Sequence, residues 1–352
     1  YNSGELEAAL EALTKAAGLR SNVPDYRYDL GLAYLKLGRA REAARELEAA
    51  LGMMGVSRET RSLEPMVLVQ LAVAYIRLGN TETARKRIEL ALKRGEDSAD
   101  AHYVLGVIES EDGNEAGAIA ELRAAVERDR DHADANLALA KRLEDMGRGE
   151  EARESLRHAS HARPQSFEIA MALGDLAFRA NDLVEAEEAF GAAHRMRPED
   201  DRAAYNLGTV ALARGRGKES IELLRLLVER DEPHDAAAFN LAQAYRDTGS
   251  VDRSRDLLRE LLQRRPDFAG ASFALALVLE SLEDLEGAAS AYRAAIDLEK
   301  DDLAAHLNLA AVLEPLDRLE EARAVLESAL KIPMDEDREQ AIREAIRSLE
   351  PR

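Results

Sequence analysis

The chain has 352 residues, of which 46% are hydrophobic and 33% are charged, and this composition excludes an intrinsically disordered protein. Tryptophan is absent and aromatic residues amount to 4%, which favours helices over strands. The formal net charge of −20 opposes binding to nucleic acid or to anionic membranes, and the absence of cysteine excludes disulfides and thiolate chemistry. No apolar run approaches the ~18 residues that cross a bilayer, so we expect a soluble protein without membrane insertion. Arginine outnumbers lysine, which indicates a GC-rich bacterial genome, and the compartment stays open between cytoplasm and periplasm.

Leucine followed by glycine or alanine recurs along the chain in one register, with a step of 34 residues from Leu71 onward. The pairs are Leu30-Gly31, Leu71-Ala72, Leu105-Gly106, Leu139-Ala140, Leu173-Gly174, Leu207-Gly208, Leu241-Ala242, Leu275-Ala276 and Leu309-Ala310. Seven residues after each pair comes a turn residue, and Gly215 in this place is expected to end a helix with a positive φ. Apolar residues at i, i+3, i+4 and i+7 on both sides of the turn predict two helices in each unit.

This 34-residue helix–turn–helix pattern resembles the tetratricopeptide repeat. The resemblance covers nearly the whole chain and implies an all-α fold. The expected architecture is an α-solenoid, a right-handed superhelix whose concave side is lined by the first helix of each repeat. The chain departs from the family in two ways. The bulky aromatic residue expected three residues before each leucine pair is missing, and the closing proline survives only at Pro164, Pro198 and Pro266.

The N-terminal part of the chain is irregular. Residues 1–23 are predicted to be the second helix of a partial repeat, whose first helix would lie before Tyr1, so we expect the array to begin upstream. Residues 24–64 are predicted to be repeat 1 with a seven-residue insertion. The extra residues either lengthen a helix or form a protruding loop.

The rest of the chain is regular. Residues 65–334 are predicted to hold repeats 2–9. In the last of them Pro315 is expected to shorten or bend the first helix, because proline removes a backbone donor. Residues 335–352 are predicted to be a C-terminal capping helix with one apolar stripe.

Catalytic motifs are not apparent. The segment Gly215-Arg-Gly-Lys218 is not a phosphate-binding loop, because Leu212 and Glu219 stand where that motif needs glycine and serine or threonine. His158 and His161 share a helix face but no third ligand is implied. We therefore expect no enzyme activity, no catalytic residue, no cofactor and no metal.

The candidate binding residues lie on the first helices, at positions that the resemblance places in the concave groove. The residue before each leucine pair gives the polar candidates Gln70, Asn206, Asn240 and Asn308. The two asparagines in consecutive repeats resemble the ladder with which some long arrays of this family grip a peptide backbone. Other positions on the same face give Tyr205, Phe239, Gln243, Arg246, Asp175, Phe178, Arg179 and Lys141.

An apolar set lies in the first repeats and consists of Leu32, Leu35, Val73, Ile76 and Val107. This set is predicted to bind an amphipathic helix or an apolar strand. Contact with first helices upstream of Tyr1 is an alternative. The bulky residues of the groove, such as Tyr205 and Phe239, could equally pack against the next repeat.

Acidic groove candidates outnumber basic ones, so the expected partner is another protein that offers a neutral or basic segment, and nucleic acid is not expected. The predicted function is a non-catalytic protein-interaction scaffold that binds a peptide or helical segment in the concave groove. One alternative is a self-associating spacer in a larger multiprotein assembly, such as one of the cell envelope or of a secretion system. Another is a regulatory array of a longer polypeptide whose catalytic part lies outside this chain.

Overall fold

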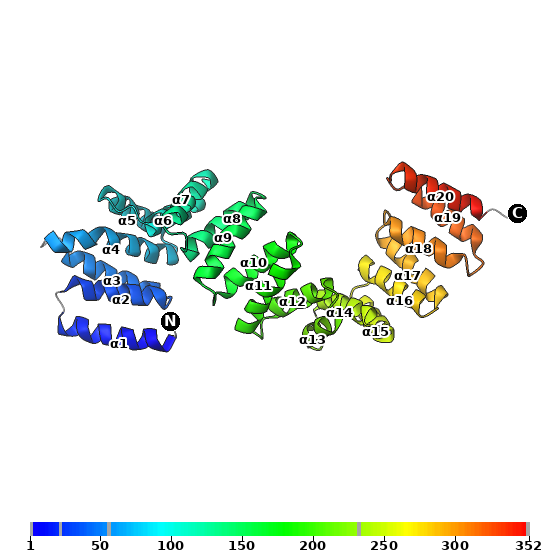
Figure 1. Cartoon of the computed structure of the whole chain (residues 1–352), viewed down its shortest axis with the longest axis horizontal. Helices are drawn as coiled ribbons and strands as arrows, with labels where there is room; N and C mark the ends of the chain where they lie inside the picture. The colour runs from blue at the N-terminus through cyan, green and yellow to red at the C-terminus, as the bar shows by residue number, and fades with distance from the viewer. Residues whose placement is uncertain (1–2, 21–22, 55–57, 231–233, 350–352) are drawn as a thin grey trace. The chain divides into compact units, whose positions relative to one another are not determined.

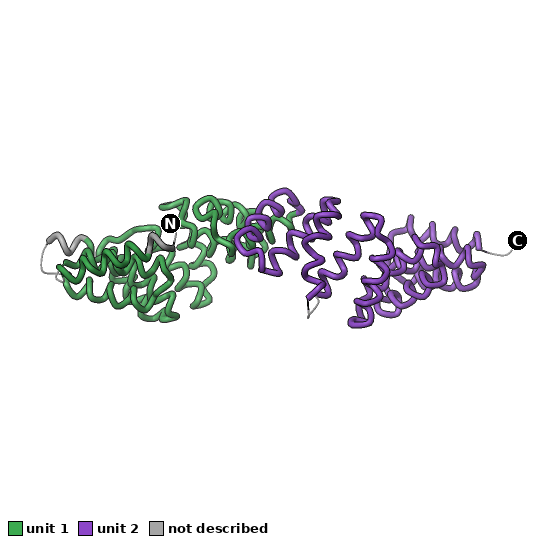
Figure 2. The backbone as a smooth tube through the Cα atoms, turned by 90° about the horizontal axis from the view of Figure 1, so that it is seen from below, with its two compact units in different colours: residues 1–180 green, residues 181–352 purple. Residues whose placement is uncertain are grey.

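The computed structural model describes residues 3–20, 23–54, 58–230 and 234–349, and all twenty elements in these ranges are α-helices (Figure 1). The chain divides into two compact units, unit 1 at residues 1–180 and unit 2 at residues 181–352 (Figure 2). Each unit is a tandem stack of helix pairs, an α-solenoid. None of the described helices combines the length and the apolar character needed to cross a membrane.

Unit 1 holds ten helices, which Figure 1 shows following one another in chain order. Their bounds are α1 (Ser3–Leu19), α2 (Pro24–Lys36), α3 (Ala40–Met53), α4 (Arg58–Arg77), α5 (Thr81–Lys93), α6 (Ala99–Glu111), α7 (Glu115–Arg128), α8 (Ala133–Asp145), α9 (Gly149–Ala162) and α10 (Phe167–Arg179). The even-numbered helices are the first helices of the repeats.

Unit 2 also holds ten helices. Their bounds are α11 (Leu183–Met196), α12 (Asp201–Ala213), α13 (Gly217–Val228), α14 (Asp235–Asp247), α15 (Val251–Arg264), α16 (Ala269–Ser281), α17 (Leu285–Leu298), α18 (Leu303–Leu313), α19 (Leu319–Ala329) and α20 (Glu336–Ser348). Here α12, α14, α16 and α18 are first helices, and α20 packs on α19 with Ile342 and Leu349 buried.

The turn inside each repeat closes in the predicted backbone conformation. Gly215 has a φ of 72°, which confirms its predicted role. The amide of Arg216 donates to the carbonyl of Ala211 at 2.8 Å, as in a Schellman helix end. The other eight residues at this register position also have positive φ, and three of them are not glycine: Asn181, Glu283 and Asp317.

The start of most first helices is fixed by a side-chain cap that repeats every 34 residues. In this place Ser98, His132, Ser166, Asp200, His234 and Asp302 each accept a hydrogen bond from the backbone amide three residues later. A cap of this kind satisfies one of the amides that a helix N-terminus leaves without a partner.

The small residues of the leucine pairs let two helices approach closely. A Cβ atom added to Gly208 in α12 would lie 2.8 Å from Cγ of Leu224 in α13, and Leu224 is fully buried. Leu224 packs against this small residue, and removing a buried leucine side chain costs roughly 2–5 kcal/mol.

Two irregular places of the sequence have simple structural outcomes. Helix α4 has 20 residues against 13 in α6, so the described part of the insertion lengthens a helix. Helix α18 ends at Leu313 after 11 residues, which confirms that Pro315 shortens it.

The prediction that Leu35 lies in the binding groove does not hold. Its side chain is only 5% exposed and packs with Ala43 and Leu47, because it lies on the α2 face that meets α3.

Candidate partner-binding site

The first-helix face is defined here as the side of the first helices that carries the residue before each leucine pair and its neighbours on the same stripe. In unit 1 this face brings together side chains from α4, α6 and the start of α8. Nε2 of Gln70 in α4 donates to Asp100 Oδ2 in α6 at 2.6 Å. Nε2 of His132 lies 2.9 Å from Asp100 Oδ1. Gln70 was predicted from the sequence as a site residue, and the structure gives it a carboxylate partner.

His132 has two hydrogen-bonding tasks that together fix its tautomer. Its Nδ1 accepts from the amide of Ala135 at 3.1 Å and caps α8, so the proton lies on Nε2 and is donated to Asp100. The hydrogen bond with His132 lowers the pKa of Asp100, although burial of that carboxyl opposes the shift. Burial by itself lowers the pKa of His132, but the bond to Asp100 and the charges of nearby aspartates outweigh it and raise the pKa.

Two tyrosines border this cluster. The ring of Tyr103 in α6 lies 5.3 Å from the ring of His132, centroid to centroid. Burial raises the pKa of Tyr28 in α2, and the charges of Asp100 and Asp29 raise it further. Tyr28, Gln70, Asp100, Tyr103 and His132 are named here the Asp100 cluster.

An acidic pair lies beside this cluster on α2. Asp25 and Asp29 are both exposed and one helical turn apart. Burial raises the pKa of Asp29, and the charge of Asp25 raises it further. A raised pKa means that the folded chain disfavours this carboxylate charge, so a cation placed between the two aspartates would be attracted.

The apolar residues predicted for the first repeats lie between buried and exposed. Leu32, Val73, Ile76 and Val107 are each half-buried. Val73 and Ile76 pack against the core of α4 to α6, so only part of each side chain is free for a partner. With Leu35 removed from the set, these four residues form the apolar part of the face.

The other candidates of unit 1 lie on α8 and α10. Lys141 is exposed, Asp175 is half-buried, and the ring of Phe178 is 38% exposed. Arg179 forms an ion pair with Glu144 of α8 and is therefore partly neutralised. These residues keep the first-helix face polar in the second half of unit 1.

The two predicted asparagines of unit 2 differ in their contacts. Nδ2 of Asn240 in α14 donates to Oγ1 of Thr209 in α12 at 3.0 Å and lies 3.5 Å from the hydroxyl of Tyr205. Asn206 is half-buried on α12 and is itself engaged in an interaction. The amide of Asn240 thus bridges two repeats.

The remaining candidates of unit 2 are half-buried and have partners or neighbours of their own. The ring of Phe239 packs 5.1 Å from Phe268, and Arg246 pairs with Asp247 at 2.9 Å. Asn308 forms a hydrogen bond with Tyr292 that lowers the pKa of the phenol, although burial dominates and raises it overall. Gln243 lies one turn from Asn240 on the same face of α14.

His132 and its contact with Asp100 were absent from the residues predicted as a site. The signal that could have found it is the 34-residue step, because His132 follows Ser98 and precedes Ser166 at the cap position. A histidine where other repeats carry serine or aspartate marks a cap with a second ring nitrogen left for another partner.

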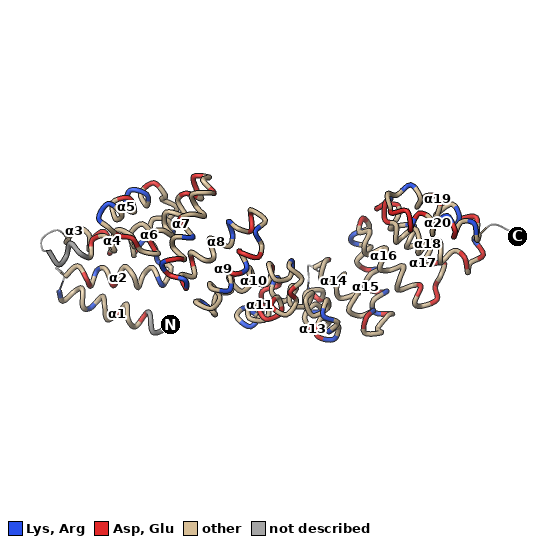
Figure 3. Tube along the Cα trace, turned by 45° about the horizontal axis from the view of Figure 1, so that its top comes forward, with Lys and Arg blue, Asp and Glu red and all other residues tan. Residues whose placement is uncertain are grey.

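Charge on both units is mixed at short range, with acidic and basic segments alternating along the helices (Figure 3). Many arginines pair with carboxylates of the preceding or following repeat, as Arg123 does with Glu151 at 2.8 Å. Among the described residues, no group of three or more histidine, aspartate or glutamate side chains is arranged to hold a metal ion. The first-helix face therefore offers hydrogen bonds, aromatic rings and negative charge to a partner.

Several solved structures are similar in fold to this chain. The Cut9-Hcn1 hetero-tetramer of the APC/C aligns with a TM-score of 0.45 and 16% identity, over 89% of this chain and 60% of that chain. PilF of Pseudomonas aeruginosa aligns with a TM-score of 0.45 and 21% identity, over 60% of this chain and 96% of that one. Yeast Tom70 aligns with a TM-score of 0.43 and 13% identity, over 99% of this chain and 92% of its own. Comparison with the curated proteins finds no match to the sequence.

Two family profiles described as tetratricopeptide repeat match the sequence itself. One matches residues 1–53, 69–133, 239–302 and 273–341, and the other matches residues 110–176 and 177–233. Together with the helix pairs, their 34-residue register and their turns, these matches establish the family. The chain belongs to the tetratricopeptide repeat family.

Proposed function

We propose that the chain is a non-catalytic protein-interaction scaffold that binds a basic segment of a partner protein on the first-helix face of unit 1. The tetratricopeptide repeat in general supports interaction between proteins, and the choice of face and of partner charge is our inference. The observation that carries the proposal is the pair of exposed carboxylates Asp25 and Asp29, one helical turn apart on the same face as the Asp100 cluster, and the raised pKa of Asp29 agrees with it.

The physical argument is that folding disfavours the charged form of Asp29. A carboxyl group with a raised pKa lowers the free energy of unfolding at neutral pH, and this loss disappears as the pH falls through the raised pKa and the group is protonated. A lysine or arginine of a partner would reverse this penalty by supplying the missing positive charge. Tyr28 and Tyr103 add partly buried aromatic surface for the aliphatic part of such a side chain.

The test is a selection of random twelve-residue peptides displayed on phage, carried out on the full chain. We expect the selected peptides to be enriched in lysine and arginine. Their dissociation constants, measured by fluorescence anisotropy, are expected to rise about three- to tenfold in the double variant Asp25→Asn and Asp29→Asn. The free energy of unfolding of this variant should be unchanged or slightly higher.

The matched control removes the same two charges from the second helices of unit 1, by Glu89→Gln in α5 and Glu127→Gln in α7. Both residues are exposed. The control is expected to change peptide affinity less than twofold. Equal weakening by the two double variants would mean that only the net charge of the chain matters, and the proposed face would be wrong.

In unit 2 we propose that Asn206, Asn240 and the neighbouring Tyr205 and Gln243 contact the backbone of a bound segment. The support is the bridge from Asn240 to Thr209, which holds the amide between two repeats. An amide side chain both donates and accepts, so a pre-oriented one suits a peptide group.

A further inference from the structure

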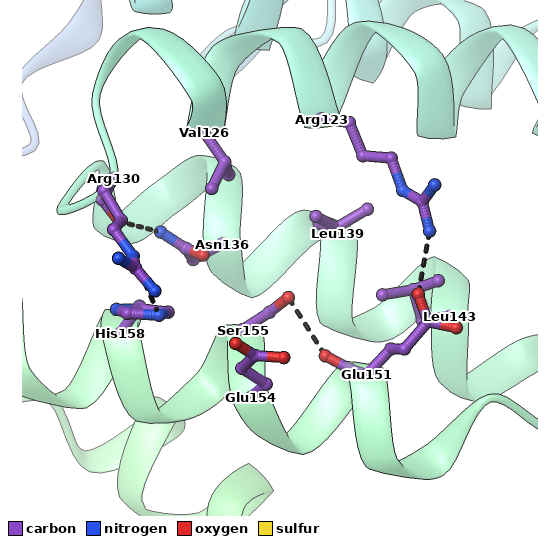
Figure 4. Close-up of a pocket in the computed structure, with 10 residues that line it drawn as sticks. All are labelled: Arg123, Val126, Arg130, Asn136, Leu139, Leu143, Glu151, Glu154, Ser155 and His158. Atoms are coloured by element: carbon purple, nitrogen blue, oxygen red, sulfur yellow. Dashed lines mark hydrogen bonds and ion pairs between the residues drawn. The ribbon is translucent and has the colours of Figure 1, made fainter.

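A pocket of about 220 Å³ opens between α7, α8 and α9, away from the residues discussed so far (Figure 4). Its apolar wall is formed by Val126, Leu139 and Leu143, and Asn136 of α8 and Ser155 of α9 also line it. Arg123 and Arg130 lie at opposite ends of the pocket in Figure 4.

At this repeat the side chains do not form an inter-helix bridge that two other repeats contain. At the corresponding register positions of two other repeats, Arg27 bonds to Glu46 and His102 bonds to Glu121, each at 2.6 Å and each across 19 residues. In the repeat of α8 and α9 the same two positions hold Asn136 and Ser155. The hydroxyl of Ser155 donates instead to the carbonyl of Glu151 at 3.2 Å.

The missing bridge leaves a buried acceptor unsatisfied. Asn136 is 0% exposed, and its Nδ2 donates to the carbonyls of Arg130 at 2.8 Å and of His132 at 3.1 Å. Its Oδ1 has no hydrogen-bond partner among the described residues. Buried polar atoms are nearly always paired, and an unpaired one costs roughly 1–3 kcal/mol. A donor supplied from outside would satisfy this acceptor.

The charges of the pocket restrict which donor fits. The guanidinium of Arg130 donates to Nε2 of His158 at 3.2 Å, and Arg123 pairs with Glu151 at 2.8 Å. A guanidinium group attracts the face of an aromatic ring, so the two arginines at the ends of the pocket favour a ring between them. Apolar walls favour the same choice.

We propose that this pocket takes the indole ring of a tryptophan from a partner protein, with the indole N–H donating to Asn136 Oδ1. Indole fits because its nitrogen donates and does not accept, which matches a lone acceptor among apolar walls. The chain contains no tryptophan, so the ring comes from another molecule. Because Oδ1 is closed to solvent, the ring reaches it when a lining side chain moves.

The test uses N-acetyl-tryptophanamide as the probe. Its fluorescence can be followed in isolation, since the full chain contributes no tryptophan signal. We expect a saturable blue shift of the probe. The same molecule methylated on the indole nitrogen keeps the ring and loses the donor, and it should bind about three- to tenfold more weakly. Equal affinity of the two probes, or the absence of a saturable shift, overturns the proposal.

A double variant closes the pocket with a pair of side chains that another repeat of the chain already contains. Asn136→His combined with Ser155→Glu recreates the pair formed by His102 and Glu121, so the helices are expected to fold as they do in that repeat. This variant should abolish the saturable shift while its helical circular dichroism stays unchanged. A second variant, Glu127→Gln in α7, removes an exposed charge outside the pocket lining and should keep probe binding within twofold. An undiminished shift in the double variant would place the indole elsewhere and refute the assignment.

Discussion

The turn between α16 and α17 tests how a residue other than glycine at the turn position affects the stability of a repeat. Glu283 occupies the turn position with a φ of 61°, a conformation that favours glycine. Its side chain is exposed, and the described residues include no hydrogen-bond or ion-pair partner for it. The substitution Glu283→Gly therefore removes strain without removing a side-chain contact.

The magnitude follows from two opposing effects. The Cβ of an L residue in the left-handed region costs about 1–2 kcal/mol, and glycine removes this cost. Glycine also loses more backbone entropy on folding, by about 0.4–1 kcal/mol. Loss of a negative charge at the C-terminal end of α16 adds a few tenths of a kcal/mol. The net expectation is a gain of about 1 kcal/mol for this turn.

The assay is native-state hydrogen exchange, because local opening is better defined than global unfolding in a solenoid, where each repeat contacts only its neighbours. We expect slower exchange of the backbone amides of α16 and α17. Glu283→Gln separates the charge effect and should recover only the smaller part of the gain. Ala294→Gly, at an exposed helical site in α17, should speed exchange, since glycine costs about 1 kcal/mol there. Unchanged or faster exchange in Glu283→Gly would refute the strain argument.

Three further outcomes follow from the contacts described above. Asp100→Asn should lower the melting temperature most between about pH 4 and pH 6.5 and less outside this window. Because the pKa of Asp100 is lowered, its contribution to stability is lost as the pH falls and the carboxylate is protonated. Because the pKa of His132 is raised, the attraction between the two side chains is lost as the pH rises and the imidazole is deprotonated. A difference in melting temperature that does not depend on pH would contradict the pairing. Tyr292→Phe should lower the free energy of unfolding in urea by about 1 kcal/mol, because the hydroxyl of Tyr292 donates to Glu280 at 3.0 Å. Tyr292→Ala should lower it by about 3–5 kcal/mol, because the ring is fully buried. Equal losses would mean that packing of the ring contributes nothing. Asn240→Ala should lower the free energy of unfolding by less than about 1.5 kcal/mol and should weaken the binding of a peptide selected on unit 2 by more than tenfold. A larger loss of stability with unchanged peptide affinity would assign Asn240 a purely structural role.

Much of the fold could be predicted from the sequence because it depends on local rules repeated at a fixed step. The 34-residue register placed the helix pairs, and it placed Gly215 at a positive φ because the turn needs a left-handed backbone, which glycine adopts without a steric penalty. The early end of α18 followed from the chemistry of Pro315 in the same way. Each of these features is decided within one or two helical turns of the residue that causes it.

The contacts of the candidate sites depend on distances between repeats, which no periodic pattern contains. The register put Leu35 on the same stripe as Leu32, but only the approach of α3 decides that Leu35 is buried while Leu32 is not. The bond of Asp100 to His132 joins residues 32 apart, and it forms because α6 and the start of α8 lie side by side.

The pocket at Asn136 also depends on packing, since residues of α7, α8 and α9 line it together. By itself the sequence determined the helices, their turns and the faces they present. Tertiary structure decided which side chains on those faces reach one another, because that depends on side-chain length against the gap between packed helices.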